Sequence, residues 1–110
     1  MLKFPSLRTG KYIAQGAHAS QLALREAQDW FPDWYKEYME GHIRKIVVYV
    51  NTTEELEELY WIALGKQLPT ALVKDSGFTE FKGVPTLTAV GIGPAPDDLI
   101  DPITKHLPLF

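Results

Sequence analysis

The sequence contains no cysteine. This absence excludes a disulfide scaffold, a zinc or iron–sulfur site with cysteine ligands, and a thiol nucleophile. The sequence also lacks the run of about 20 apolar residues that a membrane-spanning helix needs, and its start lacks the apolar segment of a secretory signal. We therefore expect a soluble protein of the cytoplasm that has no membrane partner.

The residues that are present are typical of one folded domain over residues 1–110. Of these 110 residues, 45% are hydrophobic and 23% are charged, a balance that favours a globular core over disorder. The formal net charge is −3, but Lys3, Arg8, Lys11 and Arg25 stand in a first quarter without any acidic residue. This distribution indicates a face that binds a polyanion, or an asymmetry that arose by chance in a small domain.

Hydrophobic periodicity and turn residues predict four helices and three strands in an α/β domain. The helices are expected at 11–30, 32–41, about 53–65 and from about 97 onward. The strands are expected at 43–50, 70–74 and 86–92. This order predicts a single three-layer domain in which helices cover both faces of a small mixed β-sheet.

Two stripes of side chains run along the first predicted helix. Spacings of three and four predict that one stripe is buried, and its members are Ile13, Ala17, Ser20, Leu24, Ala27 and Phe31. A neighbouring stripe brings an ammonium, an amide and an imidazole to one side of the helix, and consists of Lys11, Gln15, His18, Leu22 and Arg25. Farther along, Thr52 and Glu55 have capping-box spacing, and we expect Pro102 to be tolerated only in the first turn of the last helix.

Spacing excludes most familiar catalytic and cofactor motifs. The three histidines lack metal-ligand spacing, and 97–101 (DDLID) fits the acidic first turn of a helix better than a metal site. The loop after the strand 70–74 is more informative. An aspartate at a strand end, with a threonine four residues later, can orient a water or a substrate hydroxyl, or Asp75 can simply cap the loop in an Asx turn. The residues alone leave both interpretations open.

Four segments resemble, in order, the signatures of the type II peptidyl-tRNA hydrolases, the archaeal and eukaryotic kind. Residues 10–19 (GKYIAQGAHA) resemble GK-x-A-A-Q-x-x-H-A, and 74–79 (KDSGFT) resemble R-D-A-G-x-T. Residues 86–94 (TLTAVGIGP) resemble T-x-T-x-x-x-I-G-P, and 100–107 (IDPITKHL) resemble I-D-x-x-T-x-H-L. The resemblance covers nearly the whole chain.

The resemblance implies an enzyme that hydrolyses the ester joining a peptide to the terminal ribose of tRNA, without a metal or cofactor and with peptidyl-tRNA as its partner. The catalytic candidates that it implies by motif position are Lys11, Asp75, Thr79 and Thr88. Asp75 would orient or deprotonate the attacking water, the two threonines would hold water and carbonyl in line, and Lys11 would neutralise the oxyanion or a terminal phosphate. The implied substrate- and tRNA-binding residues are Arg8, Gln15, His18, Arg25, Lys74 and Lys82.

The chain departs from the family pattern in its first nine residues. Family members begin with a hydrophobic strand, whereas 1–9 (MLKFPSLRT) contain Pro5, which argues against a central strand. We expect the family's first strand to be missing, because the sheet has three strands or because the sequence starts at a downstream methionine. In the second case the missing strand would expose ladder groups and apolar surface, which would invite aggregation or pairing with another chain, for example as a homodimer. Two alternatives to the hydrolase remain: a non-catalytic RNA- or protein-binding module on the same fold, and an ester hydrolase for another acylated tRNA.

Overall fold

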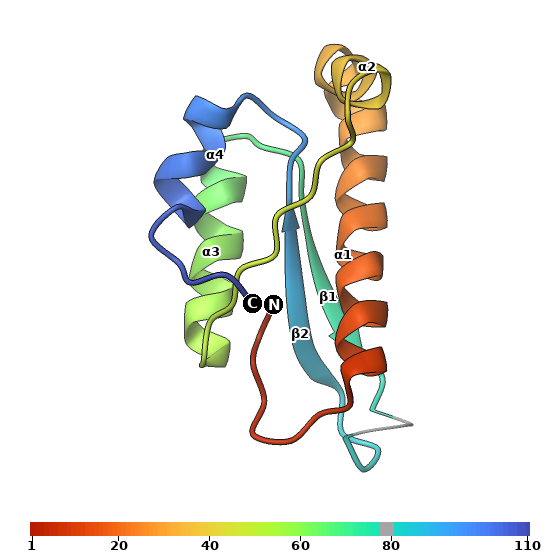
Figure 1. Ribbon diagram of the computed structural model, residues 1–110, viewed down its shortest axis with the longest axis vertical. Helices are drawn as coiled ribbons and strands as arrows, with labels where there is room; N and C mark the ends of the chain where they lie inside the picture. The colour runs from red at the N-terminus through yellow and green to blue at the C-terminus, as the bar shows by residue number, and fades with distance from the viewer. Residues whose placement is uncertain (78–80) are drawn as a thin grey trace.

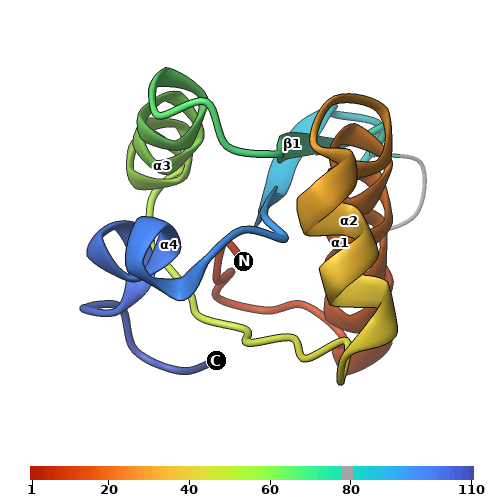
Figure 2. The same cartoon turned by 90° about the horizontal axis from the view of Figure 1, so that it is seen from above.

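A computed structural model describes residues 1–77 and 81–110, which form three layers (Figure 1). The elements in chain order are α1 (Thr9–Trp30), α2 (Pro32–Glu40), α3 (Thr53–Gly65), β1 (Thr70–Asp75), β2 (Thr86–Ile92) and α4 (Asp97–Thr104). The two strands are the middle layer. α1 packs on one face of both strands, and α3 packs on the other face beside α4 (Figure 2). The predicted α/β domain with helices on both faces of a small sheet is confirmed.

The two strands form an antiparallel ladder with one irregularity. The register shifts between Val73 and Lys74, because β2 contains one residue more than β1 at this point. Such a β-bulge bends the strand and changes which face a side chain occupies. The β-bulge lies two residues from the end of β1, where the polar residues of the candidate site gather.

Residues 43–50 do not form the predicted third strand. In the described chain this segment makes two isolated bridges, a parallel one between Val50 and Leu2 and an antiparallel one between Val48 and Leu109. The backbone nitrogen of Leu2 also donates to the carbonyl of Thr88 at 2.9 Å, so the first residues lie between β2 and Val50. A β-ladder needs consecutive paired residues on both segments, whereas each end of the chain pairs with segment 43–50 at one residue. In place of the predicted mixed sheet there is an antiparallel pair of strands, with a parallel contact at the isolated bridge between Leu2 and Val50.

The buried stripe of α1 shares only Ala27 with the predicted one. It consists of Gln15, Ala19, Ala23 and Ala27, whereas Ile13 is 68% exposed. Gly91 of β2 explains this rotation: a Cβ there would overlap the carbonyl group of Ala19 and lie 3.0 Å from the Cβ of Ala23. Because the backbone of α1 lies directly on β2, the space between them admits alanine but not the larger side chains that hydrophobicity alone favours.

Turn and capping residues set most helix ends. Pro32 begins α2 and Gly41 follows its last residue. The predicted pairing of Thr52 with Glu55 at the start of α3 is confirmed in its N-cap bond, in which Oγ1 of Thr52 accepts a hydrogen bond from the backbone nitrogen of Glu55 at 3.1 Å. The side chain of Glu55 accepts from the Thr52 hydroxyl at 2.9 Å, in place of the backbone nitrogen that a full capping box uses. Pro102 lies inside α4, so the expectation for it is wrong; in a helix of 8 residues, its missing N–H removes a single hydrogen bond. Within the described chain, no helix is long and apolar enough to cross a membrane.

The cap of α3 supports a first prediction, about stability. Replacing Thr52 with alanine leaves the amide of Glu55 without its intramolecular acceptor, so we expect a loss of about 1 kcal/mol in the free energy of unfolding. Urea denaturation followed by circular dichroism measures the loss. Thr53→Ala, one residue farther and inside the helix, is the matched control and should cost less than about 0.5 kcal/mol. Equal losses in the two variants would contradict the role of Thr52 as the cap.

Candidate active site

The packing of α1 on the sheet brings two side chains of α1 to Asp75 at the end of β1. Nζ of Lys11 lies 2.8 Å from Oδ2 of Asp75, and Nε2 of Gln15 donates to the same oxygen at 3.2 Å. Lys11 and Gln15 are four residues apart, which places them on one side of the helix. The side chains of Lys11 and Asp75 are only 15% and 11% exposed. The ion pair is therefore shielded but still reaches solvent.

The surroundings of Asp75 lower the pKa of its carboxyl group. The hydrogen bond from Lys11 has the largest effect, followed by that from the backbone nitrogen of Gly77, and partial burial opposes them. The charge of Lys11 and the amide of Gln15 act in the lowering direction as well. Asp75 is therefore an anion at neutral pH, and its low pKa makes it a weak proton acceptor.

The chain turns sharply just after Asp75. The backbone nitrogen of Gly77 donates to Oδ1 of Asp75 at 2.7 Å, which is the hydrogen bond of an Asx turn. Gly77 has a φ of +87°, and a Cβ at this position would overlap the backbone of Val84. The Asx turn that the sequence left open is therefore present, and it uses one carboxylate oxygen while the other contacts Lys11 and Gln15.

Thr88 lies behind Gln15, on the side away from solvent. Its side chain is 0% exposed, and Oγ1 donates to Oε1 of Gln15 at 2.7 Å. Gln15 is itself only 3% exposed. Thr88 thus contacts Gln15, which contacts Asp75, so three of the predicted site residues form one connected network with Lys11.

An open groove of about 510 Å³ borders this network. The residues that line it are Gln15, His18, Leu22, Leu72, Val73, Lys74, Asp75 and Ser76. Leu72, Val73 and Ser76 contribute to the wall of the groove but are not among the predicted site residues. They lie directly before and after Lys74 and Asp75 in the sequence. This position could have predicted their place in the wall, because neighbouring residues at a strand end are exposed on both faces.

The remaining predicted residues are more widely spread. His18 and Lys74 line the groove. Arg8 precedes the first turn of α1, and both it and Lys82 are exposed. Arg25 is exposed too, but it lies about 21 Å along the axis of α1 from Lys11. Thr79 falls outside the described residues.

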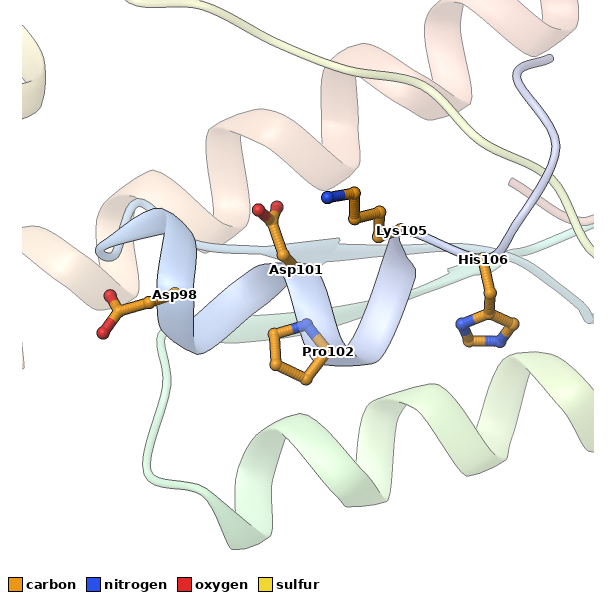
Figure 3. A pocket seen from close by; sticks show the side chains of 5 residues that line it. All are labelled: Asp98, Asp101, Pro102, Lys105 and His106. Atoms are coloured by element: carbon orange, nitrogen blue, oxygen red, sulfur yellow. The ribbon is translucent and has the colours of Figure 1, made fainter.

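A second hollow, of about 550 Å³, follows α4 and lies away from Asp75. Its lining is Asp98, Asp101, Pro102, Lys105 and His106, and Figure 3 shows the two aspartates pointing in different directions. Over residues 1–77 and 81–110, no group of three or more histidine or acidic side chains could hold a metal ion. Asp97 and Asp98 stand in the first turn of α4, as the sequence predicts for this acidic run.

These features define a small α/β domain with a connected polar site at one end of its sheet. The family model for peptidyl-tRNA hydrolase PTH2 matches residues 3–110. The chain is 38% identical over 103 residues to the peptidyl-tRNA hydrolase of Thermococcus onnurineus, covering 94% of this chain and 86% of that protein. It is 41% identical over 101 residues to the peptidyl-tRNA hydrolase of Methanocaldococcus jannaschii, covering 92% and 87%.

The peptidyl-tRNA hydrolase of Staphylothermus marinus is also 41% identical, over 92% of this chain and 83% of that protein. The chain therefore belongs to the peptidyl-tRNA hydrolase PTH2 family. The family that the four motifs predict is confirmed, and with it the expected class of enzyme.

Proposed function

We propose that this chain hydrolyses the ester between a peptide and the terminal ribose of tRNA, and that the reaction takes place at the Lys11–Asp75 pair. The observation that supports this location is the 2.8 Å contact between Nζ of Lys11 and Oδ2 of Asp75. It joins two of the motifs that resemble the family signatures, although they are far apart in the sequence. The contact lies beside a groove that is open to a large substrate.

The two charged groups have complementary roles in this proposal. Asp75, as an anion with a lowered pKa, accepts a hydrogen bond from a water and aims it at the ester carbonyl without removing its proton outright. Lys11 places a positive charge where negative charge develops on the carbonyl oxygen. The water oxygen bonds to the carbonyl carbon, the ester C–O bond breaks, and the proton that leaves the water ends on the ribose oxygen. The products are a peptide with a free carboxyl group and tRNA with a free terminal hydroxyl.

Exposed cations near the groove are the proposed contacts to the phosphates of tRNA. Arg8, Lys74 and Lys82 are exposed on segments that adjoin the site, and Arg25 would reach a more distant phosphate. His18 is placed in the wall of the groove, where it can contact the end of the tRNA or the peptide. Because the substrate is a product of translation, we place the protein in the cytoplasm.

A homodimer belongs to this proposal as well. Among the residues that the structure describes, segment 43–47 forms neither a ladder nor a bridge, and Ile43, Ile46 and Val47 are 48%, 64% and 48% exposed. A second copy that covered this segment would bury the three apolar side chains.

The test of the proposed function is single-turnover hydrolysis of an N-blocked aminoacyl-tRNA by excess protein in the presence of EDTA. We expect release of the blocked amino acid well above the rate in buffer, and no loss in EDTA because Lys11 supplies the positive charge. The same tRNA without protein gives the background. A folded protein that binds tRNA with a steep salt dependence but releases no product would instead be an RNA-binding module.

A further inference from the structure

We propose that Thr88 acts as a positioning residue: the β-bulge in β2 turns its hydroxyl onto Gln15, and Gln15 in turn holds the carboxylate of Asp75 toward Lys11. The proposal rests on the function proposed above for the Lys11–Asp75 pair. It assigns to Thr88 a role behind the reacting groups, in place of direct contact with the water or the carbonyl.

The position of the β-bulge sets the direction of the Thr88 side chain. Ala89 lies opposite Val73 and Leu87 lies opposite Lys74, so Thr88 between them has no partner in β1. Successive side chains of a regular strand point to opposite faces. Thr88 and Ala89 are both 0% exposed, yet both lie on the face toward α1, where Thr88 donates to Gln15 and Ala89 packs in one cluster with Ala19. The extra residue thus adds a polar side chain to a face of the sheet that Ala89 already occupies.

The hydrogen bonds from Thr88 to Gln15 and from Gln15 to Asp75 run in one direction. An ionised carboxylate only accepts, so the group that Gln15 turns toward Asp75 is its amide NH₂, at 3.2 Å. The amide oxygen of Gln15 then faces Thr88, whose hydroxyl is the donor at 2.7 Å. The alternative acceptor for this hydroxyl, the carbonyl of Val73, is 3.5 Å away. The negative charge of Asp75 therefore sets the direction of both hydrogen bonds, and the hydroxyl of Thr88 holds the amide of Gln15 from the side opposite Asp75.

Thr88 and Gln15 are both buried. Thr88 has no surface from which to contact a substrate, and Gln15 is 3% exposed with both ends of its amide occupied. A buried amide oxygen that loses its only donor must find another partner or rotate. If the hydroxyl of Thr88 is removed, the amide of Gln15 is free to turn, and its NH₂ no longer holds Asp75 at the angle that Lys11 requires. Thr88 therefore acts on the reaction through Gln15.

The test compares Asp75→Asn and three further variants in hydrolysis of an N-blocked aminoacyl-tRNA. Thr88→Val keeps the shape but removes the hydroxyl, and we expect kcat to fall on the order of 10-fold with KM unchanged. We also expect the acid limb of its pH–kcat profile to move to higher pH, because a weaker hydrogen bond from Gln15 raises the pKa of Asp75. Thr88→Ser keeps a hydroxyl and should restore kcat and the pH profile. Thr70→Val is the matched control, because it removes a buried hydroxyl at the other end of β1, where Thr70 donates to the carbonyl of Leu68.

The outcomes separate this proposal from the proposed function. If Thr88→Val has normal kcat and pH profile while Asp75→Asn is inactive, the site stands and the positioning role is overturned. If Asp75→Asn retains full activity, the location of the reaction itself is wrong. If Thr88→Val and Thr70→Val lose kcat equally, without a shift of the acid limb in either, loss of stability explains the effect and the positioning role is again overturned.

Discussion

An Asp75→Asn variant is expected to hydrolyse an N-blocked aminoacyl-tRNA on the order of 100-fold more slowly than the unchanged protein, or more slowly still. The substitution removes the charge that pairs with Lys11 at 2.8 Å. It also introduces a mismatch, because an asparagine has one acceptor oxygen while donors from Gly77 and Gln15 approach both carboxylate oxygens. Single-turnover rates with excess protein measure the loss directly.

A matched control is available in the second ion pair that the described residues form. Asp97 lies 3.6 Å from Arg44, and both side chains are largely exposed, so Asp97→Asn should leave the hydrolysis rate unchanged. The hydrolysis rate of Lys11→Met should fall to a level similar to that of Asp75→Asn, because the two residues act as a unit and the losses from the two substitutions do not add. An Asp75→Asn protein that is folded and as active as its parent would place the reaction elsewhere.

The largest expected effect on stability comes from Gly91→Val. The backbone of α1 lies directly on β2 at this point, and a Cβ at position 91 would overlap the carbonyl of Ala19. The helix must move away from the sheet, so we expect a loss of about 3 kcal/mol or more, equivalent to a fall in Tm of roughly 10 °C or more. Thermal unfolding followed by circular dichroism measures the fall.

Gly65→Ala is the control for this substitution, because nothing lies within 4 Å of the added Cβ. It should leave Tm unchanged or raise it slightly, since alanine restricts the unfolded chain. If Gly91→Val unfolded at the same temperature as the parent protein, the close approach of α1 to β2 would not exist in solution.

The sequence predicts well the features that depend on neighbouring residues. Pro32, Gly41 and the pair Thr52–Glu55 mark helix ends, and these ends are found within a residue or two of their expected places. The contact between Lys11 and Asp75 cannot be predicted in this way, because no local pattern connects residues so distant in the chain. The family signatures supplied that expectation, while the residues alone left Asp75 as a capping group or a site residue.

Three features could not be predicted, and each depends on packing between distant segments. The buried stripe of α1 follows from a glycine on β2, whereas periodicity ranks positions by the hydrophobicity of their own side chains. The segment 43–50 has the composition of a strand, but its partners are single residues at the two chain ends. The place of Thr88 in the β-bulge has no signature in the pattern of β2, since an extra residue looks like any other in the sequence.

The β-bulge makes the chemistry separable from the architecture. Without Thr88, Ala89 would still lie opposite Val73 and Leu87 opposite Lys74, now as consecutive pairs of an uninterrupted ladder. The sheet would keep its contacts with the helices on both sides, and Gln15 would lose the group that orients it. Given the positioning role proposed for Thr88, we expect an in-frame deletion of its codon to slow the reaction on the order of 10-fold while the gene still encodes the folded domain.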